Sequence, residues 1–213
     1  MKKIAVLLML LMPLTALAQN VWEKPQDTAT EPEQQAQQEK ENPNAKYLRG
    51  AVPLVDGKVE WQLDVDVPGK SAQQIYDIMY KCLNDLTKSE GQLEGSCIAV
   101  VNKQENTVVA SVREWMTFTS SFISLDRAKF HYTLIAKCSD GHMTMTMSRI
   151  SYRYEETTNR KAVYTAEEWI TDDNAVNKKN TKLYPGSAKF RKKTIDRKDM
   201  LFETITNLLT SKQ

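Results

Sequence analysis

The densest group of chemically active side chains in this sequence is a basic stretch near the C-terminus. Residues 178–198 hold nine lysines and arginines against a single acid, Asp196. A concentration of one sign of charge attracts anionic partners, such as phospholipid headgroups, anionic glycans or an acidic protein. The candidate docking residues within it are Lys189, Arg191, Lys192 and Lys193. The alternative is a solvated loop whose cations pair with acids elsewhere in the chain, such as Glu60 and Asp64.

A second candidate contact surface is an aromatic stretch at residues 115–125, where large apolar side chains are interspersed with serines and threonines. Its candidate partner-binding residues are Trp115, Phe118 and Phe122. An apolar stretch that stays exposed marks a contact site, whereas a covered one belongs to the core. We expect Met143, Met145 and Met147 to belong to the core, and the alternative is an adaptable wall of an apolar groove beside this stretch.

Sequence patterns typical of catalysis and cofactor binding are missing. The two histidines, His131 and His142, lie on two strands of a predicted hairpin but near its opposite ends, too far apart to share a metal ion. The motifs Gly-x-Ser-x-Gly and Gly-x-Gly-x-x-Gly and the P-loop are all absent. Adjacent glutamates occur in two pairs, but sequence neighbours point apart. We therefore expect no enzyme activity, no cofactor and no metal site, and an enzyme of unrecognised type is the third alternative.

The first 18 residues have the pattern of a secretory signal peptide. Lys2 and Lys3 precede an apolar run, and Ala16-Leu17-Ala18 gives a cleavage site before Gln19. The run is too short to span a bilayer of about 30 Å, so we expect export to the periplasm or beyond, without a transmembrane anchor. Cleavage removes two cations and no acid, so 27 basic residues then balance 27 acidic ones. This neutrality argues against nucleic acid as a partner.

Three cysteines are an odd set for an exported chain: Cys82, Cys97 and Cys138. One disulfide with a free thiol is an alternative, but we expect three small buried thiols. No Cys-x-x-Cys occurs, so neither a redox motif nor a cysteine zinc site is indicated.

The chain after the signal peptide divides into a polar segment and one domain. Residues 19–58 are rich in Gln and Glu and offer little apolar surface, which predicts a disordered tether and a lead-in. Residues 59–213 have the periodic patterns of a single folded domain.

Within this domain, the patterns predict the order β-α-β-β-β-β-α-α. Strands are predicted at residues 59–67, 97–101, 107–115, 129–138 and from 142 onward. Helices are predicted from Ser71 to Leu86, at residues 166–178 and after Asp196, and the first two follow the capping boxes Ser71/Gln74 and Thr165/Glu168. Consecutive strands without helices between them imply an antiparallel sheet with helices on one face, an α+β fold.

Asp140-Gly141 is a strong signal for a two-residue hairpin turn of type I′. This turn fixes a register in which Leu134 faces Met147 on the partner strand. Beyond that pair, the apolar residues of the second strand resume one residue out of phase, which predicts a β-bulge near Ser148-Arg149.

Three segments resemble a bacterial exported family of unknown function with a TATA-binding-protein-like (TBP-like) fold. They are Val59–Val67 with the following helix, Tyr164–Asp172 and Lys189–Asp196. The resemblance implies a curved antiparallel sheet of about five strands with helices packed on one face. It implies no known activity and no catalytic residues, and a fold does not fix a function.

These patterns favour a non-catalytic binding or interaction module of the envelope, which docks on a protein, glycan or lipid through the basic and aromatic stretches. The second interpretation is a carrier of a small hydrophobic or amphiphilic ligand in a groove between the sheet and the C-terminal helix. The sequence leaves the partner and the oligomeric state open.

Overall fold

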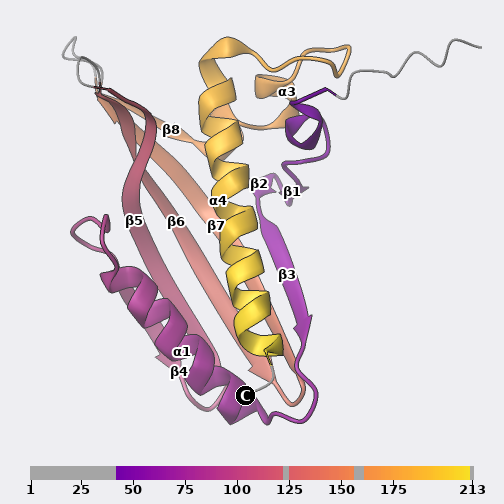
Figure 1. Cartoon of the computed structure of the whole chain (residues 1–213), viewed down its shortest axis with the longest axis vertical. Coiled ribbons are helices and arrows are strands. Elements are labelled where there is room, and N and C mark those ends of the chain that lie inside the picture. The colour runs from indigo at the N-terminus through magenta and orange to yellow at the C-terminus, as the bar shows by residue number, and fades with distance from the viewer. Residues whose placement is uncertain (1–41, 122–124, 156–160, 212–213) are drawn as a thin grey trace, which may run out of the picture. The chain divides into compact units, whose positions relative to one another are not determined.

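Six strands form one antiparallel sheet in the computed structural model, which describes residues 42–121, 125–155 and 161–211 (Figure 1). The strands are β3 (Trp61–Asp66), β4 (Cys97–Asn102), β5 (Thr107–Ser120), β6 (Leu125–Ser139), β7 (His142–Glu155) and β8 (Lys161–Thr165). Their order is β3-β7-β6-β5-β4, and β8 pairs with the second half of β7. The predicted α+β class and antiparallel sheet are confirmed. The additional strand is β8, which is short and directly follows a polar stretch.

Two long helices pack against one face of this sheet, α1 (Ala72–Lys88) and α4 (Pro185–Thr210) (Figure 1). Both predicted capping boxes are present, at Ser71 before α1 and at Thr165 before the short helix α2 (Ala166–Trp169). The remaining short elements are η1 (Ala45–Tyr47), β1 (Leu54–Val55), β2 (Lys58–Val59) and α3 (Asp172–Ala175). No helix in the described ranges has both the length and the apolar character needed to cross a membrane.

The core lies between the sheet and the two long helices because alternate strand residues turn toward them. The inward residues of β6 and β7 include Phe130, Tyr132, Leu134, Ala136, Met143, Met145 and Met147, each at most 1% exposed. The methionines are therefore core residues and form no groove wall. The intervening residues of β5, β6 and β7 point away from the helices and are mostly polar, and we call this side of the sheet the open face.

The predicted hairpin between β6 and β7 has the expected register. Leu134 pairs with Met147, and beyond this pair the register shifts by one residue where Arg149 has a positive φ of 53°. The β-bulge is therefore confirmed. Of the two turn residues only Gly141 has a positive φ, at 72°, so the turn is not of type I′. The Gly141 carbonyl accepts a hydrogen bond from the Val67 amide at 2.8 Å, so contacts outside the hairpin shape this turn.

Several elements differ from the sequence prediction, and three of these differences are large. Strand β5 continues to Ser120 instead of ending at Trp115, so the aromatic stretch is largely strand. One predicted helix is split into α2 and α3. Helix α4 begins with Pro185, and Asp196 lies inside it instead of capping it. The apolar pattern does not reveal the early turns of α4, because polar residues such as Arg191 occupy buried positions there.

The folded unit also begins earlier than the predicted boundary at Val59. Val52 is only 4% exposed, and Tyr47 packs against the core. Residues 42–58 are thus part of the domain, whereas the predicted signal peptide and the rest of the tether, residues 1–41, lie outside the described residues. This segment has few apolar residues, so its sequence gives no sign that it is folded. Its structure depends on contacts with α4, which is distant in sequence.

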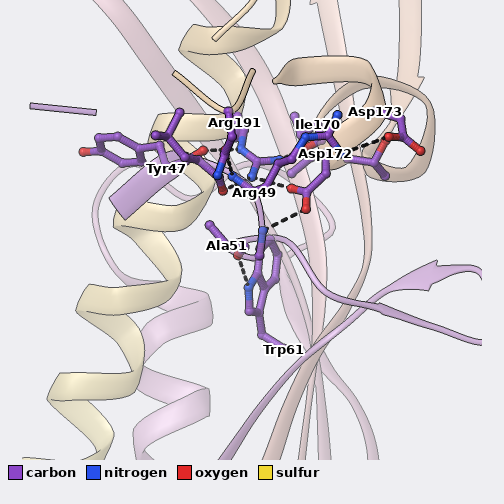
Figure 2. A network of polar contacts seen from close by, with 12 residues as sticks. Tyr47, Arg49, Ala51, Trp61, Ile170, Asp172, Asp173 and Arg191 are labelled. Carbon is purple, nitrogen blue, oxygen red and sulfur yellow. Dashed lines mark hydrogen bonds and ion pairs between the residues drawn. The ribbon is translucent and has the colours of Figure 1, made fainter. Parts of the chain in front are cut away.

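A buried arginine joins this N-terminal segment to α4 (Figure 2). The Arg191 side chain is 0% exposed and forms an ion pair with Asp172 at 2.7 Å. Its guanidinium also donates to the carbonyls of Tyr47, Leu48 and Ile170, each at 2.6 Å. The Gly50 amide donates to the other Asp172 oxygen at 2.8 Å. These bonds satisfy a charge that would otherwise be costly to bury.

The three cysteines are all free thiols, with Cys97 exposed, Cys82 half-buried and Cys138 buried. The prediction of three buried thiols therefore holds for Cys138, is wrong for Cys97 and holds only in part for Cys82. Burial raises the pKa of the Cys138 thiol to about 11, which keeps it protonated and unreactive at neutral pH.

We expect a thiol reagent to modify Cys97 rapidly in the native protein and Cys138 only after unfolding, because thiolate character and access control the reaction. Mass spectrometry of peptides after timed labelling with iodoacetamide measures the order. The variant Cys97→Ser is the control and should lose the fast phase. Fast native modification of Cys138 would contradict the burial described above.

Candidate functional site

The predicted basic docking residues are mostly engaged within the fold. The Lys189 ammonium forms an ion pair with Asp126 at 2.7 Å and donates to the Tyr154 hydroxyl at 2.9 Å. Arg191 is fully buried, so it cannot contact a partner, and this part of the prediction is wrong. Lys192 is half-buried and lies 5.4 Å from the Tyr47 ring centre. Of the four residues only Lys193 is exposed, so they form no continuous cationic surface.

The aromatic candidates are also separated by the structure. The Phe118 ring packs edge-on against Phe190, with ring centres 4.7 Å apart, and belongs to the margin of the core. Phe122 lies outside the described residues. Trp115 lines the two cavities described below.

A groove of about 480 Å³ lies on the open face, across β5, β6 and β7. Six of its lining side chains occupy two adjacent rows of cross-strand partners. The first row is Arg113, His131 and Ser151, and the second is Trp115, Lys129 and Arg153. Val163 of β8 continues the second row beside Arg153. The register of the sheet therefore assembles this groove, and we call it the open-face groove.

Two like charges face each other in this groove. Lys129 pairs directly with Arg153 across the β6–β7 ladder. Side chains at such positions have Cβ atoms about 4.5–5.5 Å apart, and like charges there are destabilising. Arg113, diagonal to Lys129, adds a third cation. Among the described residues, none of these three cations forms an ion pair with a carboxylate, although Glu94 borders the same groove.

Trp115 provides an aromatic surface at one end of the groove, and two cations pack against its ring. The Arg127 guanidinium lies 3.7 Å from the centre of its ring, and the Lys129 ammonium lies 5.6 Å from it. Cations over an indole face gain electrostatic energy from its quadrupole. Arg127, Lys129 and Trp115 therefore support one another at one end of the open-face groove.

His131 sits between the cations of the groove. Its Nε2 lies 3.1 Å from the Ser111 hydroxyl. Burial, followed by the charge of Arg113, lowers the pKa of His131 below its ordinary value, so the imidazole is neutral at neutral pH. A neutral imidazole with a lowered pKa is poised to take a proton if negative charge enters the groove.

The second histidine lies in a different, acidic part of the open face. His142 Nδ1 is 2.9 Å from Asp66, and its Nε2 is 3.5 Å from Asp64. Hydrogen bonding to Asp66 raises the pKa of His142. The described residues contain no group of three or more His, Cys, Asp or Glu side chains arranged to hold a metal ion.

A second cavity, of about 500 Å³, lies on the helix side of the sheet beneath α4. Its floor is an ion pair in which Arg197 donates to both Glu114 oxygens, at 2.7 and 2.6 Å. The Tyr132 hydroxyl and the Gln92 amide also donate to this carboxylate. Glu114 thus has its acceptors occupied and connects β5, β6 and α4.

The cations of the open-face groove are scattered along the sequence, and the cross-strand registers alone bring them together. The predicted hairpin register already implies that Lys129 faces Arg153, since its bulge shifts the pairing by one residue. The polar positions of that register therefore contain a signal for this pair. Arg113 requires the additional register of β5 with β6.

Comparisons with known proteins agree with this architecture. The family model "Domain of unknown function (DUF4468) with TBP-like fold" matches residues 61–153. The crystal structure of a DUF4468 family protein from Bacteroides ovatus ATCC 8483 is 37% identical, with a TM-score of 0.73, and the match covers 79% of this chain and 96% of that one.

The crystal structure of a TBP-like protein from Parabacteroides distasonis ATCC 8503 shares the fold at 21% identity, with a TM-score of 0.60 and coverage of 76% and 99% of the two chains. No curated protein matches the sequence. The predicted resemblance is confirmed: this chain belongs to the DUF4468 family and has its TBP-like fold.

Proposed function

We propose that this protein is an exported, non-catalytic binding module that captures an anionic ligand in the open-face groove. The observation that carries the proposal is the pairing of Lys129 with Arg153 across two strands, without a carboxylate partner for either among the described residues. Export rests on the signal-peptide pattern of residues 1–18.

Repulsion between Lys129 and Arg153 in the free groove is relieved when an anionic ligand binds. Opposed cations on a sheet destabilise the free protein, and an anion between them converts this repulsion into attraction. Three cations from three adjacent strands line the groove: Arg113, Lys129 and Arg153. The ladder fixes the spacing of their backbone positions, so the backbone needs no ordering when a ligand binds.

The side chains around the groove favour binding over catalysis. The Ser111–His131 contact resembles the nucleophile and base of a hydrolase, and a hydrolase also needs a third group that orients the imidazole. Among the described residues the only polar side-chain partner of His131 is Ser111, and no carboxylate pairs with it. We therefore assign His131 to the recognition of charge.

Neutralising the two opposed cations tests this function. We expect Lys129→Gln combined with Arg153→Gln to weaken binding to immobilised dextran sulfate by roughly tenfold or more, because charge-assisted hydrogen bonds are lost. The measurement is the NaCl concentration that elutes each protein. The matched control is Lys178→Gln with Lys179→Gln, which removes two exposed lysines remote in sequence from the groove. Equal elution of the wild type and both variants would contradict the proposal.

The cavity beneath α4 favours a second candidate function, a carrier of a small amphiphile. It lies between the sheet and the C-terminal helix and is bordered by Met116, Phe130 and the exposed Lys193. However, Met116 and Phe130 are only 5% and 1% exposed, and the floor is an ion pair. Native mass spectrometry that finds a co-purified amphiphile, lost in Met116→Lys, would favour this carrier over the anion-binding module.

A further inference from the structure

We propose that the open-face groove is specific for a phosphate monoester carried on a hydroxylated scaffold, such as a phosphorylated sugar. This inference rests on the proposed function and names its ligand class. It comes from the net charge of the groove, from the arrangement of its cations and from the polar side chains that surround them.

The charge of the groove matches a dianion. Its lining includes three cations, Arg113, Lys129 and Arg153, and one acid, Glu94, so its net charge is +2 with His131 neutral. A phosphate monoester carries about −1.5 to −2 charges at neutral pH and balances this charge. A carboxylate carries one negative charge and leaves the Lys129–Arg153 repulsion partly uncompensated.

The positions of the cations suit a tetrahedral group with several acceptor oxygens. Arg113 and Arg153 occupy opposite corners of the two rows, and Lys129 and His131 lie between them on β6. The rows are separated by two residues along each strand, about 6.6 Å, a span that the long arginine side chains can cover. Guanidinium groups donate in pairs to phosphate oxygens, and a lysine adds a point charge.

The rest of the groove combines polar residues with apolar ones such as Leu93 and Val163, a mixture that suits a sugar better than an acyl chain. The Ser151 hydroxyl lines the groove, and the Ser111 hydroxyl contacts His131. Trp115 offers an aromatic surface at one end. Hydroxyls and an aromatic side chain contact sugar hydroxyls and the faces of sugar rings, whereas a lipid tail needs a largely apolar cavity.

Isothermal titration of the full chain with defined probes tests this ligand class. At low salt and pH 7.5, we expect glucose 6-phosphate to bind at least tenfold more tightly than glucuronate and glucose to give no binding heat. Arg153→Gln should lower the affinity for glucose 6-phosphate about tenfold. Lys178→Gln with Lys179→Gln should leave it unchanged. Inorganic phosphate should bind more weakly than the sugar phosphate, because it lacks the scaffold.

The pH dependence of sulfate binding provides a second test of His131. If His131 had only a structural role, its replacement would not change this pH dependence. Sulfate stays a dianion between pH 5.5 and 8, so any change in its affinity comes from the protein. The lowered pKa of His131 rises when the anion binds, so binding takes up a proton and the affinity increases as the pH falls. The charged groups that face His131 or line the same groove are Arg113 from β5, Lys129 from β6, Arg153 from β7 and Glu94 from the loop before β4. His131→Gln should flatten this profile.

The outcomes separate the two proposals. Retention on dextran sulfate that depends on Lys129 and Arg153, together with equal affinity for glucuronate and glucose 6-phosphate, would overturn the ligand class and leave the anion-binding function standing. A flat sulfate profile in the wild type would overturn the role of His131 as a proton-linked contact. If binding to dextran sulfate, sulfate and glucose 6-phosphate is absent, both proposals fail.

Discussion

Replacing Arg191 by leucine is expected to lower the free energy of unfolding by about 3–5 kcal/mol, because it leaves the partner groups of a buried ion pair unpaired. The substitution removes the donor for three carbonyls, those of Tyr47, Leu48 and Ile170, and the counter-charge of Asp172 (Figure 2). Urea denaturation followed by tryptophan fluorescence measures the change. A loss below about 1 kcal/mol would contradict the structural role of this side chain.

Two further variants keep this test informative if Arg191→Leu does not fold. Asp172→Asn retains the carbonyl contacts of the guanidinium and should cost less, about 1.5–3 kcal/mol for a charged hydrogen bond. Lys193→Ala, on the same helix but exposed, should change the stability by at most about 0.5 kcal/mol. The ranking of the three variants therefore shows whether the loss of stability comes from the buried contacts of Arg191 or merely from one positive charge fewer on α4.

Removal of the carboxylate of Glu114 should have an effect of similar size. Glu114→Leu leaves the Arg197 guanidinium without its anion, at side-chain exposures of 12% and 22% for the two residues. It also removes the acceptor of the Tyr132 hydroxyl. We expect a loss of about 3–5 kcal/mol in the free energy of unfolding, because breaking one side of a buried pair costs more than the pair contributes.

The double variant Glu114→Leu with Arg197→Met is the control for this prediction. Replacing both charges by apolar groups removes the uncompensated cation, so the double variant should recover at least half of the stability lost in the single one. Chemical denaturation of the wild type, both single variants and the double variant completes the cycle. Additive losses would show that the two side chains act independently, contrary to their bidentate contact.

Local sequence signals predicted the parts of the fold whose causes are local. The capping boxes at Ser71 and Thr165 and the register of the β6–β7 hairpin follow from residues close in sequence. The bulge at Arg149 also followed, because a phase change in the apolar pattern requires one additional residue. These elements needed no information from the rest of the chain.

Features that depend on distant partners could not be predicted in this way. A basic stretch reads as exposed, yet Arg191 is buried because carbonyls from residues 47, 48 and 170 surround it. Lys189 likewise finds Asp126, which is far away in sequence. The open-face groove is an intermediate case, since the Lys129–Arg153 pair follows from a hairpin register that the sequence did predict.

The bonds that Arg191 makes to backbone carbonyls define how far the chain can be shortened. A fragment trimmed to Val59 would lack Tyr47 and Leu48, which accept two of its hydrogen bonds, and also the amide of Gly50 that holds Asp172. Such a fragment would contain the whole sheet and both long helices. It would nevertheless leave Arg191 and Asp172 exposed beside α4, without part of their hydrogen-bond partners. A shortened protein for crystallisation or spectroscopy should therefore retain residues 42–58, which lie ahead of the first strand of the sheet.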